Sequence, residues 1–309
     1  MGVKALQQLG VLPGMLEIKK QVEQIIQFHR VSKLRAQKGL KSQSQSLHMV
    51  FTGSPGTGKT TAARLVGEAF AVMGILKSPQ KGNGKIPFIE IHHADVTSKF
   101  VGEAEKTIKR KFNEAKGGVV FIDEAYAFID GESAHKSDDK VVAAIVQLME
   151  DLREEVMVIA AGYSAEMGKF LDSNPGLRSR FSNTVHFPDY SVPDMIRIAQ
   201  TMLTDRDYRP DHEFLDLLAK KLWSEKDKNG FGNARTVRNI LEQSIRMQSV
   251  RVSQIPSPTR EDLSFLTKLD IQIPEQEILS EKEILQKAMQ QIQGRLFELE
   301  LKELTAGKL

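Results

Sequence analysis

The chain has 309 residues, 40% of them hydrophobic, which is enough for two cores or for one large core with an appendage. Its 43 basic side chains nearly balance its 40 acidic ones, so the composition favours neither nucleic acid nor a membrane surface as a partner. The lack of cysteine excludes disulfides and thiolate metal sites, and no signal peptide or apolar run of roughly 20 residues is recognised, so we expect a cytoplasmic protein.

Short apolar runs alternate with helical patterns through the first part of the chain, which predicts an α/β fold with a parallel sheet. The predicted strands are, in chain order, 48–53, 87–91, 118–123, 156–162 and 184–187. The predicted helices are 16–38, 60–73, 103–115 and 139–152. The stretch 77–87, rich in Gly, Pro and Lys, is predicted to be a surface loop.

The pattern changes after this region, because residues 193–270 follow helix with helix and show no strand between them. We therefore predict three parts: an α/β core with an N-terminal helix over 1–191, a small all-α domain over 192–270, and a tail over 271–309. The tail has apolar residues at heptad spacing, namely Ile278, Leu285, Met289, Ile292, Leu296 and Leu299. This predicts an amphipathic helix that packs either on its own all-α domain or on a neighbouring subunit or partner.

The strongest chemical signal is "GSPGTGKT" over 53–60, which follows an apolar strand and opens a helix. Its glycines let backbone N–H groups turn toward phosphate oxygens, Lys59 reaches the β and γ phosphates, and Thr60 offers its hydroxyl to Mg²⁺. The predicted nucleotide-binding residues here are Gly53, Ser54, Pro55, Gly56, Thr57, Gly58, Lys59, Thr60 and Thr61. The sequence therefore predicts an ATP site with Mg²⁺ as cofactor.

A pair of acids in "VVFIDE" ends another apolar strand. We predict that Asp123 holds Mg²⁺, and that Glu124 accepts a proton from the attacking water. The alternative is an ordinary acidic turn after a buried strand.

Three arginines are candidates for contact with the phosphates. Arg178 and Arg180 lie in "NPGLRSRF" after a predicted turn, and either is a candidate arginine finger or a solvated loop residue. Arg235 lies near the start of a predicted helix in "FGNARTVRNIL", where it either reaches back to the nucleotide or forms a salt bridge on its helix.

These motifs, together with "VIAAGY" and in this order, resemble the AAA+ ATPases of the CbxX/CfqX type over about residues 10–270. The resemblance implies a nucleotide-binding core followed by a helical lid, and a homo-oligomeric ring that is usually a hexamer. It also implies that Arg180, with Arg178 as second choice, acts on the ATP of the neighbouring subunit. Where many AAA+ proteins have a sensor asparagine, this chain has Tyr163, so the residue that orients the water stays open.

The trio Phe100-Val101-Gly102 lies in the polar stretch "TSKFVGEAEKT". It either starts a helix and packs inward or, as the resemblance implies, lines the central pore and grips a polypeptide.

Together these features predict an ATP-hydrolysing ring that remodels a protein client through its pore. Within the family, the expected role is nearer to sporulation than to Rubisco activation. A nucleotide-regulated loader or scaffold that threads no peptide is the alternative of another class. The balanced charge argues against nucleic acid as the partner.

Overall fold

The computed structural model describes residues 10, 14–41, 46–76, 86–96, 103–129, 136–228 and 230–273, and five tail positions at 286, 289–290 and 292–293. The chain divides into two compact units, Met1–Tyr190 and Ser191–Leu309, and each is described by itself. In the described ranges, none of the helices combines the length and the apolar character that crossing a membrane requires.

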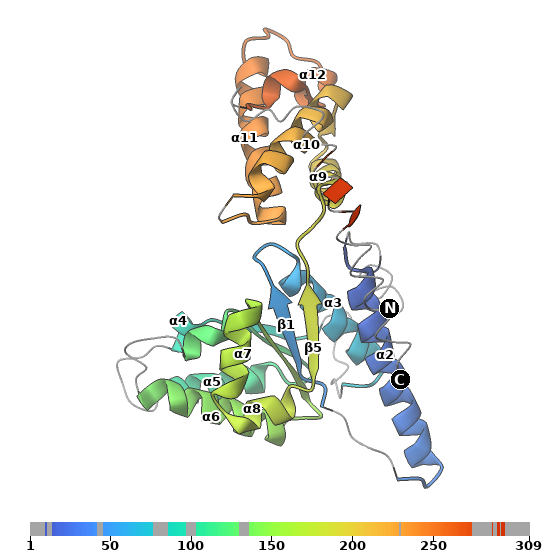
Figure 1. Ribbon diagram of the computed structural model, residues 1–309, viewed down its shortest axis with the longest axis vertical. Helices are drawn as coiled ribbons and strands as arrows, with labels where there is room; N and C mark the ends of the chain where they lie inside the picture. The colour runs from blue at the N-terminus through green and yellow to red at the C-terminus, as the bar shows by residue number, and fades with distance from the viewer. Residues whose placement is uncertain are drawn as a thin grey trace. The chain divides into compact units, whose positions relative to one another are not determined.

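The first unit, in which Figure 1 labels the neighbouring strands β1 and β5, is built on a five-stranded parallel sheet. The strand order is β2-β3-β4-β1-β5. The strands are β1 Met49–Gly53, β2 Phe88–Ile91, β3 Gly118–Ile122, β4 Val156–Gly162 and β5 Asn183–Phe187. Every residue of β1, β3 and β4 is buried, as expected for central strands with helices on both faces. The predicted α/β fold with a parallel sheet is confirmed, and each strand lies within one residue of its predicted ends.

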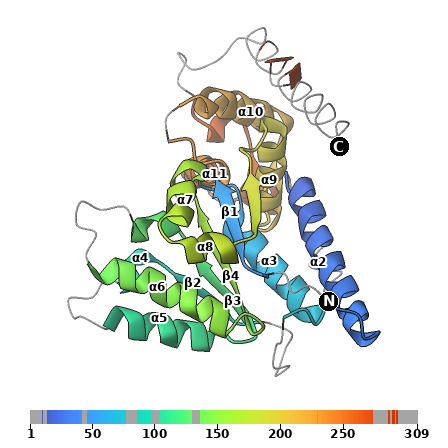
Figure 2. The same cartoon turned by 60° about the horizontal axis from the view of Figure 1, so that its bottom comes forward.

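Helices cover both faces of this sheet (Figure 2). They are α2 Leu16–Gln37, α3 Lys59–Val72, α4 His93–Val96, α5 Glu103–Glu114, the 3₁₀ turn η1 Ala125–Phe128, α6 Lys136–Asp151, α7 Ser164–Asp172 and α8 Pro175–Arg180. On one face, α5, α6, α7 and α8 pack into a shared core with strand residues such as Val50, Val120 and Val158. The helix α3 packs on β3 and β4, and α2 contacts the edge strand β5.

The segment before Arg180 differs from the prediction of a turn, because both predicted arginines lie inside α8. The dipeptide Asn174-Pro175 starts this helix: the Asn174 side chain accepts a hydrogen bond from the Gly176 N–H at 2.8 Å, and Pro175 occupies the first turn. The same residue types favour turns and helix starts, so the sequence pattern alone did not separate the two.

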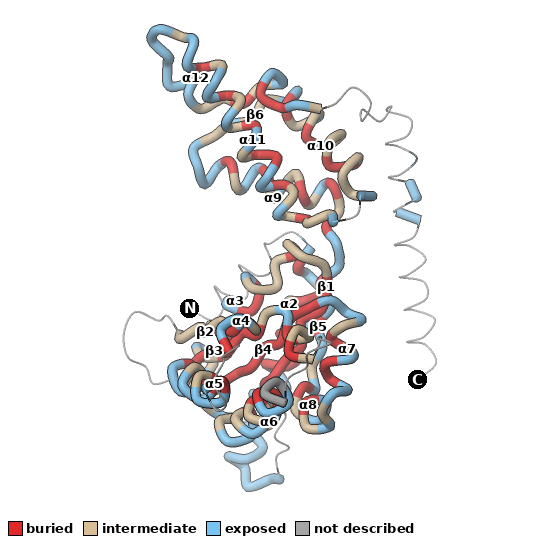
Figure 3. Tube along the Cα trace, turned by 90° about the vertical axis from the view of Figure 1, so that its left-hand side faces the viewer, coloured by how far each residue is buried: buried red, intermediate tan, exposed pale blue. Residues whose placement is uncertain are grey.

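The second unit is mainly helical, with α9 Val192–Thr204, α10 His212–Lys226, α11 Ala234–Val252, α12 Arg260–Ser264 and the 3₁₀ turn η2 Lys268–Asp270. Buried residues recur along α9, α10 and α11 (Figure 3). The prediction that this part has no strand was wrong, since β6 Arg209–Pro210 pairs in parallel with β7 Phe265–Leu266. Strands of two residues are too short to produce a periodic pattern.

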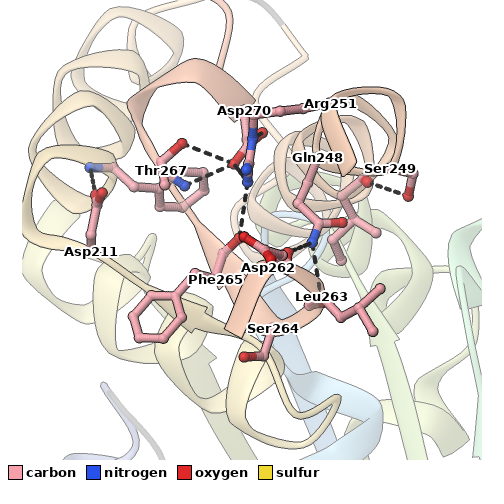
Figure 4. Close-up of polar contacts among 12 residues, drawn as sticks. Asp211, Gln248, Ser249, Arg251, Asp262, Leu263, Ser264, Phe265, Thr267 and Asp270 are labelled. Atoms are coloured by element: carbon pink, nitrogen blue, oxygen red, sulfur yellow. Dashed lines mark hydrogen bonds and ion pairs between the residues drawn. The ribbon is translucent and has the colours of Figure 1, made fainter. Parts of the chain in front are cut away.

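The segment that contains β7 and η2 is fixed to α11 by a buried carboxylate (Figure 4). Asp270 is fully buried and accepts hydrogen bonds from Arg251 Nε and Nη2, each at 2.9 Å, and from the Thr267 N–H at 2.8 Å. The hydrogen bond with Asp270 raises the pKa of Arg251, so the guanidinium keeps its charge. Gln248 extends this network by donating to the carbonyl oxygens of Asp262 and Leu263.

Candidate functional site

The loop between β1 and α3 depends on glycine at three places. Gly53, Gly56 and Gly58 have φ of 142°, 71° and 88°, which residues with a side chain rarely adopt. A Cβ at Gly53 would also collide with the carbonyl oxygen of Phe187, the last residue of β5. At Gly58, a Cβ would come within 2.6 Å of the Met15 methyl group. The loop therefore requires glycine for its backbone shape and for its fit against neighbouring elements.

Hydrogen bonds from side chains of the loop itself and from Tyr190 hold this loop in place. Lys59 Nζ donates to the carbonyl oxygens of Gly53 at 2.7 Å and Ser54 at 2.8 Å, so the ammonium lies across the loop. Thr57 is buried and donates from Oγ1 to the Ser54 carbonyl oxygen at 2.8 Å. The Tyr190 hydroxyl donates to the Thr57 carbonyl oxygen at 2.9 Å. No sequence motif pointed to Tyr190, which lies 133 residues from Thr57.

The helix α3 begins at Lys59, directly after the loop. Its first N–H groups have no partner within the helix, so the helix start and the loop together favour an anion. Of the other predicted residues, Ser54, Pro55, Gly56, Gly58 and Thr60 are half-buried, Gly53 is buried and Thr61 is exposed. The structure thus brings the predicted nucleotide-binding residues of this loop together.

Asp123 and Glu124 directly follow β3. They lie at the same edge of the sheet as the loop after β1, because parallel strands have their carboxyl ends at a common edge. One strand, β4, lies between β1 and β3, which separates their ends by about 10 Å. Asp123 is half-buried and its Oδ1 accepts the Glu124 N–H at 3.1 Å. Glu124 has φ 50° and ψ 46°, a left-handed conformation that is strained for a glutamate, and its side chain is exposed.

Two tyrosines lie beside these acids. Tyr163 follows β4, between the two motif-bearing strands, and its ring centroid is 5.9 Å from that of Tyr126. Burial, and then the charge of Glu124, raise the pKa of Tyr126 to about 12, so its hydroxyl stays protonated. A Cβ at Gly162 would come within 2.8 Å of the Tyr126 ring, so this glycine permits the close approach. Sequence reasoning identified Tyr163 and missed Tyr126.

The two arginines of α8 differ in their surroundings. The Arg178 side chain is 58% exposed, and its Nε donates to Asp172 Oδ1 at 2.8 Å. The Arg180 side chain is 25% exposed and lies 3.3 Å from Glu150, measured from Nη2 to Oε2. Neither arginine is simply the polar end of a solvated loop.

Two predicted sites belong to other parts of the chain. Arg235 is the second residue of α11 in the second unit, where it is exposed. It forms no ion pair with any residue of the described ranges. The trio Phe100-Val101-Gly102 lies outside the described residues.

Comparisons with known families match both units. A model of the family described as "ATPase family associated with various cellular activities (AAA)" matches residues 49–189. A model of the AAA lid domain matches residues 191–281.

Three curated proteins illustrate the similarity. The chain is 37% identical over 272 residues to stage V sporulation protein K of Bacillus subtilis, covering 87% of this chain and 82% of that protein. It is 34% identical over 260 residues to a chloroplastic ribulose bisphosphate carboxylase/oxygenase activase of Cyanidioschyzon merolae, covering 84% of each. It is 35% identical over 233 residues to the chromosomal protein CbxX of Cupriavidus necator, covering 75% of this chain and 71% of that protein.

Proposed function

The chain belongs to the AAA ATPases, as its motifs predicted, and we propose that it is a ring-forming motor that uses ATP hydrolysis to remodel a protein client. A role like that of sporulation protein K is favoured. The alternative, suggested by the similarity to a Rubisco activase, is that the client is Rubisco. The core, lid and tail are proposed to span 1–191, 192–270 and 271–309, and the ring is proposed to be a hexamer acting in the cytoplasm. The division into two units after Tyr190 supports the boundary between core and lid.

The observation that supports a ring is the position of Arg180 within its own subunit, far from the phosphate loop. Glu150, its ion-pair partner, follows Met149, whose carbonyl oxygen is bonded to His48 just before β1 begins. The phosphate loop begins at the other end of β1, which spans five residues or about 17 Å. Because Arg180 belongs to the far end of β1, its cation suits the ATP of a neighbouring copy better than its own.

The nucleotide fits the loop through charge and donors. Lys59 exchanges its two carbonyl partners for β and γ phosphate oxygens, and the N–H groups at the start of α3 bind the same anion. The Thr60 hydroxyl and the Asp123 carboxylate are oxygen donors of the kind that Mg²⁺ prefers, and they would hold the ion. When bound, Mg²⁺ neutralises charge on the phosphates.

Hydrolysis is assigned to Glu124 and Arg180. Glu124 accepts a proton from water while the water oxygen bonds to the γ phosphorus. The bond between the γ phosphorus and the oxygen that bridges it to the β phosphate breaks, and its electron pair leaves with ADP. Arg180 of the neighbouring subunit neutralises the negative charge that grows on the transferring group. Tyr163 directly follows the strand between the two motifs, and we propose it as a candidate for orienting the water.

Movement is assigned to the lid and the pore. Arg235 is proposed to contact the nucleotide and to transmit its state to the lid, while Phe100, Val101 and Gly102 grip the client in the pore. A loader of nucleic acid is disfavoured by the balanced charge. A scaffold that does not hydrolyse ATP would have no use for Glu124 as a base.

The test uses a Glu124→Gln chain, which we expect to bind ATP, assemble as a hexamer and retain its client through purification. Adding Phe100→Ala should abolish client retention and leave the hexamer mass and ATP binding unchanged, because an exposed pore residue is remote from the phosphates. Phe100→Tyr is the matched control and should retain the client. Lost assembly and a much lower melting temperature for Phe100→Ala would instead place Phe100 in the core and contradict the pore assignment.

A further inference from the structure

Only some of the N–H groups of the Arg180 guanidinium have partners among the described residues. Its Nη2 is 3.3 Å from Glu150 Oε2, and its Nη1 donates to the Gly176 carbonyl oxygen at 3.3 Å. Its Nε is buried and has no hydrogen-bond partner among the residues that the structure describes. A guanidinium has five N–H groups, so each Nη retains one N–H for another acceptor. The side chain is thus fixed while two donors stay available.

Glu150 is itself oriented from two sides. It is the next-to-last residue of α6, and its Oε1 accepts a hydrogen bond from Arg153 Nη1 at 2.8 Å while Oε2 faces Arg180. One carboxylate between two guanidinium groups leaves a net positive charge at this place. The cluster therefore fixes Arg180 without cancelling its attraction for a phosphate.

The end of α6 is joined to the sheet by His48. Its Nδ1 accepts the Val158 N–H at 3.1 Å, so the ring proton is on Nε2, which donates to the Met149 carbonyl oxygen at 3.1 Å. The Phe181 ring meets the His48 ring edge-on, with centroids 6.3 Å apart. The residues next to Glu150 and Arg180 in the chain are thus both held against the same buried imidazole.

We propose that Glu150 is a positioning residue for Arg180, which it holds in the orientation that directs the two remaining donors at the ATP of the neighbouring subunit. This inference rests on the proposed role of Arg180. A flexible arginine would have to lose its rotamer freedom each time it met the phosphate, whereas an oriented one has lost it already. In this proposal Glu150 acts through Arg180 alone.

The experiment compares steady-state ATPase of the full chain with that of Glu150→Gln. We expect kcat to fall about 10- to 100-fold, as for other misplaced catalytic groups, with KM for ATP changed less than about threefold. Glu155→Gln is the matched control, since Glu155 lies in the short connection after α6 and pairs with Lys116 on the surface at 3.5 Å. It should leave kcat unchanged. An unchanged or raised kcat for Glu150→Gln would overturn the proposal.

A double-mutant cycle separates positioning from a structural role. In an Arg180→Ala background, Glu150→Gln should cause no further loss of kcat, because there is no guanidinium left to orient. A second loss, or a fall in melting temperature that accounts for the first, would overturn the inference even if Arg180 itself is essential. If Arg180→Ala alone leaves the ATPase of the assembled chain intact, the proposed function of Arg180 fails, and this inference fails with it. Should Glu150→Gln fold poorly, Glu150→Asp keeps the charge and should lower kcat by a smaller factor.

Discussion

The loop at the carboxyl end of β1 and the cluster at its amino end both hold charged side chains, but they do so by different means. The loop takes its shape from three glycines with positive φ and from the start of α3. The cluster takes its shape from side-chain contacts, in which His48 bonds the Met149 carbonyl oxygen and Glu150 pairs with Arg180. The loop is therefore formed by one contiguous motif, whereas the cluster is formed by residues from separate parts of the chain.

This difference has a physical cause. Binding a triphosphate in this way requires several backbone N–H groups on a tight curve, which a fixed spacing of glycines before a helix provides. Orienting one arginine requires only a carboxylate at the right distance, which any neighbouring element can supply. The shape of the loop therefore depends on residues adjacent in the sequence, whereas the orientation of Arg180 depends on packing between separate elements.

The largest effect is expected at the nucleotide edge, from Glu124→Gln. Removing the proton acceptor should lower kcat about 10²- to 10⁴-fold, the usual contribution of a general base, while ATP still binds. Steady-state ATPase with an equilibrium ATP-binding assay measures both. Glu114→Gln is the control, because Glu114 is an exposed partner of Arg110 on α5 and should have no effect. Normal turnover by Glu124→Gln would remove Glu124 from the mechanism.

The next effect is expected at the amino end of β1, from the titration of His48. Burial lowers the pKa of His48 to about 4, with a further decrease from Arg180 and opposing increases from the Met149 hydrogen bond and Glu150. Between the ordinary pKa of 6.5 and this value, the unfolded chain binds a proton that the folded chain excludes, so the free energy of unfolding decreases as the pH falls. We expect His48 to contribute about 2 kcal/mol to the decrease between pH 7 and pH 4.5.

Denaturant unfolding of His48→Gln at both pH values checks this. The variant should lose about 2 kcal/mol less over the interval than the parent. His212→Gln is the matched control, because the His212 side chain is 89% exposed. Equal pH dependence in the parent and in His48→Gln would show that His48 is not held neutral.

The smallest effect is expected from Tyr190→Phe, which removes the hydroxyl that donates to the Thr57 carbonyl oxygen. Loss of one buried hydrogen bond should cost about 1 kcal/mol, so the Kd for ATP should rise about fivefold if the bond orders the loop for binding. Tyr208→Phe, in the second unit, is the control. An unchanged Kd would show that the loop is ordered for ATP without the Tyr190 hydrogen bond.

The strands and the loop between β1 and α3 could be predicted from the sequence because their constraints are local. The strands are apolar runs, the loop is one motif, and Asp123 and Glu124 directly follow a buried strand. The sequence could not predict that Tyr190 reaches the loop, or that His48 bonds a carbonyl 101 residues away, because neither contact leaves a periodic or adjacent signal. It misread Asn174-Pro175 as a turn and missed the two-residue strands β6 and β7, since these short elements carry too few residues for a pattern.

If Arg180 acts on the ATP of a neighbouring copy, two inactive variants should complement each other when their subunits are mixed in one ring. Lys59→Ala chains should fail to bind ATP, and Arg180→Ala chains should bind it but turn it over about 10³-fold more slowly. In mixed rings, an intact Lys59 from one chain meets an intact Arg180 from the next at about a quarter of the interfaces at equal ratio, so ATPase should return to roughly that share of the parent rate. No recovery at any ratio, in rings whose mixed composition is verified by native mass spectrometry, would contradict a finger that acts between subunits.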